Sequence, residues 1–505
     1  MANDTSSAQV QHRGFITVSL MLATTMQTLD MTIANVALPH VQGSLAATQE
    51  QMSWVLTSYI VAAAIMTPLT GWFAGRFGRK KLFMISIFSF ALTSVLCGLA
   101  HTLPEIVLFR LLQGLSGAAL VPVSQAVLLD INPPERHARA MSVWVMGVTL
   151  GPILGPVLGG WLTENYSWRW VFYINVPVGI LSLLGVSMFL AETRRRHSSF
   201  DFFGFTTLAL GIGALQLMLD RGQIKDWFSS TEICIDAAIA VIAFYLFAVH
   251  SATSRQPFID LKMFKDRNFT VGCVFIVLVG VLLFATLALL PPLLQNLMDY
   301  PVIAAGVLTA PRGIGTLLAM FFVGRLVKHF DARKVIGSGF AIVGLSLWMM
   351  CGFYLQMSDS LIVWSGLIQG FGMGLAYVPL AAVTFATLAG RYRNEGTAVF
   401  SLLRNIGSSV GIAGVQALFI RNTQIMHARL AEHVTPYAAP LQEQFGSVNA
   451  AVLAELNHRV TEQATMIAYN NDFKLLLLLS LVAIPLVFVF RKAQAPQRPA
   501  VAVAE

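Results

Sequence analysis

The chain has 505 residues, of which 56% are hydrophobic and 11% are charged. Soluble domains contain about 45–50% apolar and about 25% charged residues, so this composition excludes an ordinary water-soluble protein. The formal net charge of +8 would suggest a nucleic-acid partner in a soluble protein, but here the positive charges fall on alternate loops between apolar segments. The composition therefore indicates a membrane protein and gives no reason to expect nucleic acid as a partner.

Apolar segments recur along the chain, each long enough to cross a hydrocarbon core about 30 Å thick as an α-helix. We predict an all-α membrane protein with fourteen spans. They are expected at residues 14–36, 52–73, 81–101, 106–129, 139–162, 169–191, 203–219, 232–250, 269–290, 302–323, 333–355, 360–385, 396–420 and 472–490.

Most of the 33 lysines and arginines lie on the loops that share a side with the N-terminus. The positive-inside rule places this side in the cytoplasm, and an even number of spans then places the C-terminus there too. The first apolar run contains Asp30 and lacks a convincing cleavage site, so it is expected to be an uncleaved span. The four cysteines form no CxxC pair and carry no redox or metal signal.

Two sequence patterns recur at nearly the same offset, as duplication of a helical bundle would leave them. The basic segment 71–81 recurs 253 residues later at 324–334, and Gln113 followed by glycine recurs 256 residues later as Gln369. The pattern predicts two parallel six-helix bundles with two helices inserted between them. The expected parts are a cytoplasmic N-terminus (1–13), an N-terminal bundle (14–191), an inserted pair with flanking loops (192–268), a C-terminal bundle (269–490) that includes an outer loop (421–471), and a cytoplasmic tail (491–505).

Asp30 lies inside the first span, where a carboxylate is costly unless it is paired or protonated, so it is a functional candidate. The alternative is a hydrated capping residue near the outer surface. In the fourth span, Arg110 and Gln113 share a helical face with Gly117 and Ser124, which should face a cavity. Arg110 could also extend to the membrane surface or lock two helices together.

Asp30 is the best candidate for a proton carrier. The histidines lie in loops or near span ends, Asp130 and Glu192 lie near span edges, and no interior carboxylate is expected in the last six spans. Alternating access could change the water and the charged partners around Asp30 and so switch its protonation. Protons would be the coupling ion, and no cofactor, metal site or catalytic residue is expected.

The fifth span carries small residues at every fourth position, which suit a smooth groove for a neighbouring helix, with prolines that add bends. The alternative is helix packing with no role in transport. The residues are Gly147, Gly151, Pro152, Gly155, Pro156, Gly159 and Gly160.

Methionine, aromatic and polar side chains in the spans could form an adaptable substrate cavity, although most methionines and aromatics are expected to face lipid or to pack between helices. The arginines would favour neutral or weakly acidic lipophilic substrates, unless they lie near helix ends and are neutralised by carbonyls or lipid headgroups. The candidates are Met26, Gln27, Asn35, Tyr59, Gln113, Arg312 and Arg404.

Several stretches together resemble the fourteen-span drug:proton antiporter branch of the major facilitator superfamily. They are LDMTIANVALP at 29–39, the basic loop at 71–81, GPILGPVLGG at 151–160 and WRWVFYINVP at 168–177. The stretches 217–222, 226–228 and 264–273, with the long loop before the last span, are similar to EmrB-type pumps.

This resemblance implies efflux of lipophilic compounds in exchange for protons across a bacterial inner membrane, with Arg110 as the partner of Asp30. It also implies a periplasmic adaptor and an outer-membrane channel as partners. The loop 421–471 is the best adaptor surface, with a flexible linker as the alternative.

The basic loop departs from the family pattern at one position. Gly75 stands where the family usually has an acid that latches the cytoplasmic ends of the two halves. Its absence calls the latch into question and leaves a role as topology signals for the basic residues. The candidate residues of this loop are Gly71, Arg76, Gly78, Arg79 and Lys80.

Other functions fit the sequence less well. A proton-linked metabolite or siderophore transporter remains an alternative, and so, with less support, does a non-transporting membrane sensor, which would usually carry a soluble domain or lack Asp30. The chain contains no GxxxxGK[ST], HExxH or nucleophile-elbow pattern, so an enzyme or an ATP-driven pump is not expected.

Overall fold

The computed structural model describes residues 12–45, 47–133, 136–193, 200–432, 434 and 450–491. In this part of the chain, 12 helical segments are long and apolar enough to cross a membrane. Together with α1 and α14 they coincide with the fourteen expected spans. The helices of the first half are α1 (Arg13–Leu45), α2 (Gln49–Phe77), α3 (Arg79–Leu99), α4 (Leu103–Gly117), α5 (Leu120–Ile131), α6 (His137–Asn165), α7 (Trp170–Tyr173) and α8 (Asn175–Phe189).

The middle and second half continue the helical pattern, with a few short 3-10 or π turns at helix ends. The inserted pair is α9 (Phe202–Arg221) and α10 (Thr231–Thr253), separated by η2 (Trp227–Ser229). The second half contains η3 (Leu261–Lys265), α11 (Arg267–Pro292), η4 (Leu293–Leu297), α12 (Val302–Thr309), α13 (Pro311–His329), α14 (Ala332–Met350), α15 (Asp359–Ala386), η5 (Gly390–Tyr392), α16 (Arg393–Ala431), α18 (Ala450–Leu486) and η6 (Val487–Val489).

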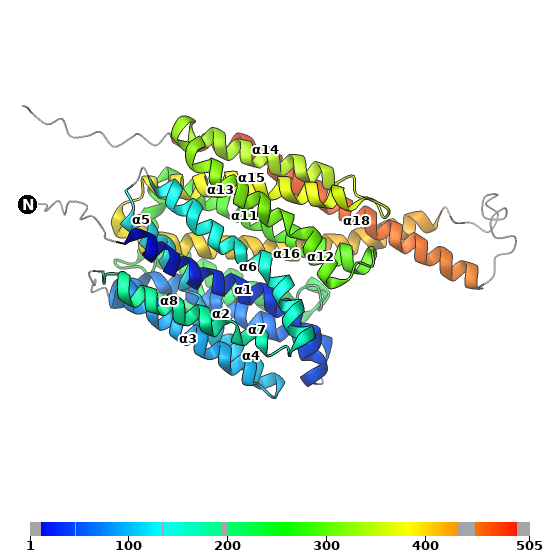
Figure 1. Cartoon of the computed structure of the whole chain (residues 1–505), viewed down its shortest axis with the longest axis horizontal. Helices are drawn as coiled ribbons and strands as arrows, with labels where there is room; N and C mark the ends of the chain where they lie inside the picture. The colour runs from blue at the N-terminus through cyan, green and yellow to red at the C-terminus, as the bar shows by residue number, and fades with distance from the viewer. Residues whose placement is uncertain are drawn as a thin grey trace, which may run out of the picture.

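The long helices lie side by side along the long axis of the molecule (Figure 1). The first span of each half packs against the fifth, as α1 on α6 and α11 on α16. The second packs against the fourth, as α2 on α4 and α13 on α15, and the third packs against the sixth, as α3 on α8 and α14 on α18. The same neighbours in the same order are what a parallel repeat produces.

The inserted helices α9 and α10 form a pair that touches both halves. Asp201 caps the start of α9 and pairs with His250 of α10 at 2.9 Å. Farther along α9, Thr57 of α2 donates to Asp220, and Ser409 of α16 donates to Gln216 over 2.8 Å. The inserted pair therefore lies against the seam between the two halves.

The expected last span, 472–490, is only the second part of a longer helix. The helix α18 begins at Ala450 and α16 continues to Ala431, so both extend beyond the bundle at one end (Figure 1). The centre of the expected loop lies outside the described residues. Because α18 starts so early, Asp472 lies within a continuous helix and is 1% exposed. The expectation that the last six spans contain no interior carboxylate is wrong.

Candidate proton-coupling site

Asp30 and Arg110 form an ion pair in the interior of the first half. Asp30 lies in the middle of α1, far from either helix end, and Arg110 lies on α4. The Nη1 atom of Arg110 is 2.6 Å from Oδ2 of Asp30, and each side chain is 1% exposed. In this structure Asp30 is a buried, paired carboxylate and Arg110 does not extend to the surface.

Two amide side chains complete the coordination of Asp30. Its Oδ1 atom accepts hydrogen bonds from Gln113 at 3.0 Å and from Asn175 of α8 at 2.8 Å. The amide of Asn175 also donates to Ser94 of α3 at 2.9 Å. The carboxylate thus joins three neighbouring helices, α4, α8 and, through Ser94, α3. Asn175 was not among the expected site residues, although it lies in the stretch 168–177 that carries the family resemblance.

The guanidinium of Arg110 is also held on several sides. It donates to the backbone oxygen of Val55 at 3.3 Å and to Oε1 of Gln113 at 2.8 Å. Its central carbon lies 4.4 Å from the ring centroid of Tyr59, a distance at which the aromatic face attracts a cation. The buried charges are therefore paired and hydrogen-bonded, which is what keeps such a pair tolerable away from water.

This arrangement can couple proton binding to helix movement. Protonation of Asp30 would remove the negative charge that balances Arg110, and leaving Arg110 buried and uncompensated is costly. A rearrangement that hydrates either group or separates them would relieve that cost. Conversely, closing the helices around an ionised Asp30 restores the pair and favours proton release.

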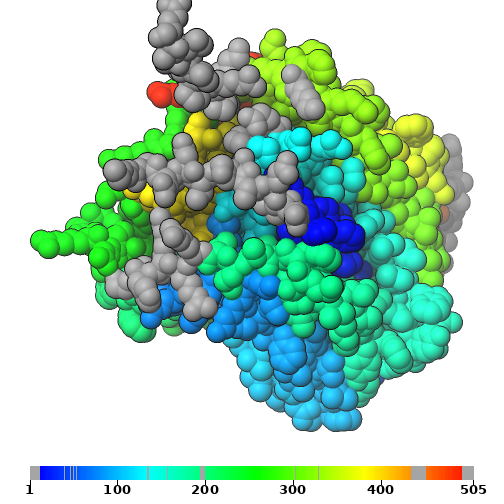
Figure 2. Space-filling view, turned by 60° about the vertical axis from the view of Figure 1, so that its left-hand side comes forward, coloured from blue at the N-terminus to red at the C-terminus, as the bar shows by residue number. Residues whose placement is uncertain are grey.

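The glycine series of α6 receives α1 at the same level. A Cβ atom at Gly151 would overlap Thr28 and the backbone of Leu29, and one at Gly155 would overlap Thr32. Thr25 donates to the carbonyl oxygen of Gly147 over 2.7 Å, and Thr28 and Thr32 donate to carbonyls of α6 in the same way. Figure 2 shows the start of α1 between α6 and α8.

Other residues of the predicted groove differ in their neighbours. Gly147 and Gly159 also face α1, through Met21 and Ile33 respectively, whereas Gly160 faces Ile303 of α12 across the seam between the halves. Pro152 is half-buried within α6, and the side chain of Pro156 lies outside the described part of the structure.

The basic loop forms a tight turn at the opposite end of the bundle from the long extension of α18. Gly78 links α2 to α3 with φ of 91°, a left-handed conformation that favours glycine. A Cβ atom there would also overlap Glu192. The carboxylate of Glu192 accepts from the backbone nitrogens of Lys80 at 3.3 Å and Lys81 at 3.2 Å, so it caps the start of α3.

Arg79 joins the two halves at this end. Its buried side chain pairs with Asp130 of α5 and donates to Asn394 of α16 over 2.8 Å. Asp130 also pairs with Arg393, the first residue of α16. Gly71 lies against the backbone of residues 394 and 395. Asp130 therefore supplies an acid to a cross-half contact that the glycine at position 75 cannot supply.

The expectation that the basic side chains of this loop serve only as topology signals is wrong for two of them. Arg79 is 6% exposed and lies in the contact just described, and Lys80 donates to the backbone oxygen of Ser187 at 2.7 Å. Arg76 is exposed on the last turn of α2, and its role in topology stays a prediction. Sequence spacing did not reveal Asp130 or Arg393 as partners because they lie far from Arg79 along the chain.

The residues expected to line a substrate cavity divide between the two halves. Tyr59 and Gln113 belong to the Asp30 cluster, Met26 is fully buried against Gly179 of α8, and Gln27 is 9% exposed with Oε1 unpartnered among the described residues. Asn35 is exposed.

The two arginines of the second half do not share one environment. Arg312 is 6% exposed on α13 and donates through Nη2 to the backbone oxygen of Leu283 at 3.0 Å, while its Nη1 has no hydrogen-bond partner in the described part of the chain. Arg404 is half-buried on α16, and its Nη2 atom donates to its neighbour Asn405 at 3.5 Å. Arg312 is therefore buried, so lipid headgroups do not neutralise it, but it lies at the start of α13 and bonds a carbonyl, as the alternative expected for an arginine near a helix end.

Comparison with known proteins agrees with this architecture. Residues 20–414 match the model of the Major Facilitator Superfamily. The chain is 37% identical to the fatty acid resistance protein FarB of Neisseria gonorrhoeae, over 94% of this chain and 95% of FarB. It is 36% identical to the multidrug export protein EmrB of Escherichia coli strain K12, over 91% of each protein. The solved proton:xylose symporter XylE superposes with a TM-score of 0.61 over 96% of this chain and all of its own, at 13% identity, which reflects the fold alone.

The chain is therefore a multi-pass membrane transporter of the Major Facilitator Superfamily, and it is not an enzyme. Within this family it is an efflux transporter of the EmrB and FarB type.

Proposed function

We propose that this transporter exports lipophilic compounds from the cytoplasm in exchange for protons, with Asp30 as the proton carrier and Arg110 as its charged partner. The observation that supports it most is the fully buried ion pair at 2.6 Å in the interior of a transporter. A charged residue in a membrane interior is costly, and one that can change its charge marks an ion pathway by default.

Proton exchange can supply enough free energy for this task. Each proton that enters through a potential of 100 mV releases about 2.3 kcal/mol, and each unit of pH difference adds about 1.4 kcal/mol. One proton per molecule would support a gradient of a neutral compound of about a few hundred-fold.

We propose that the substrates include weakly acidic lipophilic molecules. FarB is named for fatty acid resistance and EmrB for multidrug export. Arg312 is buried, and its Nη1 atom has no hydrogen-bond partner among the described residues. A buried donor of this kind gains most when it binds an anionic oxygen such as a substrate carboxylate. The remaining cavity residues, Met26, Gln27, Asn35, Tyr59 and Arg404, stay predictions.

The remaining expectations follow from this proposal and from the positive charges on the loops. We place the protein in a bacterial inner membrane with both termini in the cytoplasm, with the domain boundaries given above. A periplasmic adaptor and an outer-membrane channel would complete the export path, with the loop 421–471 as the adaptor surface. Pull-down of an adaptor by a chain that lacks residues 435–449 would argue against that surface.

The proposal is tested by proton release from everted vesicles that contain equal amounts of wild type or Asp30→Asn. The panel should contain acidic, neutral and cationic lipophilic compounds. Wild type is expected to release protons when the compounds are added, and Asp30→Asn is expected to release none, because an amide cannot carry a proton between the two sides.

The matched control is Asp226→Asn, since Asp226 is an exposed aspartate with φ of 56° in the turn between α9 and α10, and asparagine tolerates that conformation. The control should behave as wild type. Normal proton release by Asp30→Asn, at matched thermal stability, would contradict the assignment of Asp30. A wild type that responds to no compound would contradict drug export itself.

A further inference from the structure

The second half contains a carboxylate that the Asp30 mechanism does not use. Asp472 of α18 is 1% exposed, and both of its carboxylate oxygens are buried without a hydrogen-bond partner among the described residues. Asp30, by contrast, accepts three hydrogen bonds. An ionised carboxylate needs such partners away from water, so the environment of Asp472 suits the uncharged carboxylic acid.

Among the described residues, the charged and titratable groups around Asp472 offer it no counter-ion. On its own helix, Tyr469 lies one turn earlier, and Lys474 is exposed with its charge near Cys351, the residue that follows α14. On α16, Arg404 reaches Asn405 and Arg421 is exposed.

The other packed elements add little charge at this level. The helix α11 has no charged side chain after its first residue, and η4 and η6 have none. The ionisable residues of α14, Arg333 and Lys334, are at its far end, beside Asp331.

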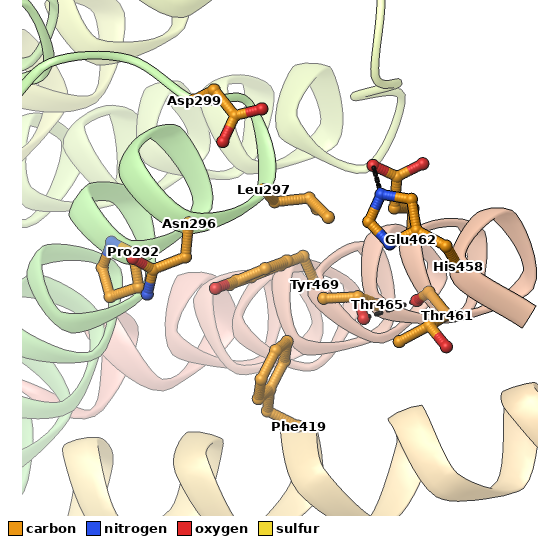
Figure 3. Close-up of a pocket in the computed structure, with 10 residues that line it drawn as sticks. All are labelled: Pro292, Asn296, Leu297, Asp299, Phe419, His458, Thr461, Glu462, Thr465 and Tyr469. Atoms are coloured by element: carbon orange, nitrogen blue, oxygen red, sulfur yellow. Dashed lines mark hydrogen bonds and ion pairs between the residues drawn. The ribbon is translucent and has the colours of Figure 1, made fainter. Parts of the chain in front are cut away.

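A pocket opens at the outer end of α18, on the side of the bundle opposite the basic loop. It has a volume of about 370 Å³ and is lined by residues from α16, α18 and the segment that follows α11. His458 and Glu462 form an ion pair at one end of it, and the side chain of Tyr469 lies along the other (Figure 3). The Tyr469 ring packs on Phe419 of α16 with a centroid distance of 4.4 Å.

A hydrogen bond beside the pocket connects the segment after α11 to α15. Tyr300, next to the pocket residue Asp299, donates a hydrogen bond to Asp359 at the start of α15. This hydrogen bond raises the pKa of the Tyr300 phenol, since it stabilises the protonated form. The pocket lies between the end of α11, α16 and α18, and this hydrogen bond connects the segment beside it to α15.

Polar side chains lead along one face of α18 from the pocket to Asp472. His458, Glu462, Thr465 and Tyr469 all line the pocket and follow one another at spacings of three or four residues. Residues at these spacings lie on the same face of a helix. Asp472 is the next residue in this series, about 4.5 Å farther along the helix axis than Tyr469.

We propose that Asp472 is a second protonation site of the transporter, which receives its proton from the outer side through the pocket above Tyr469. This inference rests on the proposed proton-driven function. A proton from outer water binds the Asp472 carboxylate as the site opens to the pocket, and the acid is then buried uncharged. The proton leaves when a rearrangement of α18 against α14 and α16 hydrates the carboxyl group.

The first test is independent of transport. Dicyclohexylcarbodiimide adds to protonated carboxylic acids in apolar surroundings, and peptide mass mapping locates the adduct. In vesicles that contain the wild-type protein, Asp472 is expected to be labelled at neutral pH. Labelling should decrease as the pH rises on the side of the membrane onto which the pocket opens. The ion-paired Asp30 should be labelled less. A wild-type Asp472 that stays unlabelled at every pH, while the reagent reaches other buried sites, would overturn the proposal.

The second test uses Asp472→Asn, which keeps the shape of the side chain, with Asp226→Asn as control and Asp472→Glu as the conservative variant. Asp472→Asn is expected to release one fewer proton per exported molecule and to lose much of its response to outer pH. Exchange of substrate for substrate should be unchanged, and Asp472→Glu should restore the response.

The two proposals can fail separately. An Asp472→Asn variant with wild-type proton release and wild-type dependence on outer pH would show that Asp472 is merely a buried structural acid. A wild type that labels at Asp472 but releases no protons with any compound would instead contradict the proposed function, and the assignment of Asp472 as a protonation site would stand on the labelling.

Discussion

The two halves of the transporter share a hydrogen-bonded frame but differ in charge. In the first half, Gln113 of α4 donates to Asp30 of α1 over 3.0 Å. In the second half, Gln369 of α15 donates to Thr286 of α11 over 3.1 Å. Both residues of the second pair lie 256 positions after their counterparts. Duplication has kept the contact between the first and fourth spans while a carboxylate in one half is a hydroxyl in the other.

The buried arginines Arg110 and Arg312 also differ between the two halves. The position equivalent to Arg110 is Gly366, and the space beside this glycine is occupied by Arg312 from α13. Arg110 and Arg312 are both buried at the fourth span of their half. Arg110 pairs with a carboxylate, whereas Arg312 has no ion-pair partner among the described residues. In the proposed mechanism this pair of the first half holds and releases a proton, and Arg312 of the second half offers a positive group to an anionic substrate.

The largest expected effect on stability comes from removing Arg110, the counter-charge of Asp30. Arg110→Met should lower the free energy of unfolding by about 3–5 kcal/mol because it leaves Asp30 buried without its counter-charge. Gln369→Met removes an uncharged hydrogen bond to Thr286 and should lower the free energy of unfolding by only about 1 kcal/mol. Thermal unfolding of the purified proteins measures both.

The double variant Asp30→Asn with Arg110→Met should recover most of the lost stability, since no charge is then left unpaired, but should not transport. Equal destabilisation by Arg110→Met and Gln369→Met would show that the charged pair adds nothing beyond ordinary hydrogen bonding.

A smaller effect is expected from the glycines that the two halves share. Gly407 and Gly411 of α16, at the same 256-residue offset from Gly151 and Gly155, lie against the backbone of α11 at Val277 and Val281. Gly151→Ala and Gly407→Ala should each cost about 1–3 kcal/mol of stability through overpacking.

The control for this pair is Gly414→Ala on the same helix as Gly407, because nothing lies within 4 Å of the added methyl group. Its stability should match or slightly exceed that of wild type. If Gly151→Ala folds as stably as this control, the close packing of α1 on α6 is not what the glycine provides.

The smallest effect on stability, with a selective effect on transport, is expected from Arg312→Gln. Loss of a charged hydrogen bond to a substrate carboxylate should raise the KM for acidic compounds about tenfold, and leave neutral compounds nearly unchanged. Arg404→Gln is the matched variant and should have less effect, since Arg404 is half-buried on a different helix. Equal KM values for acidic compounds in wild type and Arg312→Gln would contradict an anion site in the second half.

Site residues that are unusual within their own segment could be predicted from the sequence. Asp30 and Arg110 are charges inside apolar segments, and Gln113 shares a helical face with Arg110. The structure brings these three residues together as expected. Asn175 and Ser94 could not be predicted in the same way because buried amides and hydroxyls are common in membrane helices, and only the packing of α3 and α8 brings them toward Asp30.

Hydrophobicity placed Asp472 at the edge of the last expected span. The segment 421–471 is polar and helical in pattern, so the membrane-spanning part was expected to begin only after it. The structure continues α18 through this region because its polar side chains lie outside the bundle core or line the outer pocket. Hydrophobicity reports contact with lipid, and it does not report where a helix extends past the lipid.

The sequence by itself determined the membrane environment, the number of spans, the parallel repeat and the candidate proton carrier. These depend on composition, on periodicity and on the cost of a charge in an apolar segment, all of which are local properties. Tertiary structure alone decided which groups pair across the chain, such as Asp130 with Arg393 and Gln113 with Asp30. It also decided that Asp472 is buried without a hydrogen-bond partner in the described part of the chain. Pairing and burial depend on how helices distant in sequence pack, and that information is not contained in any single segment.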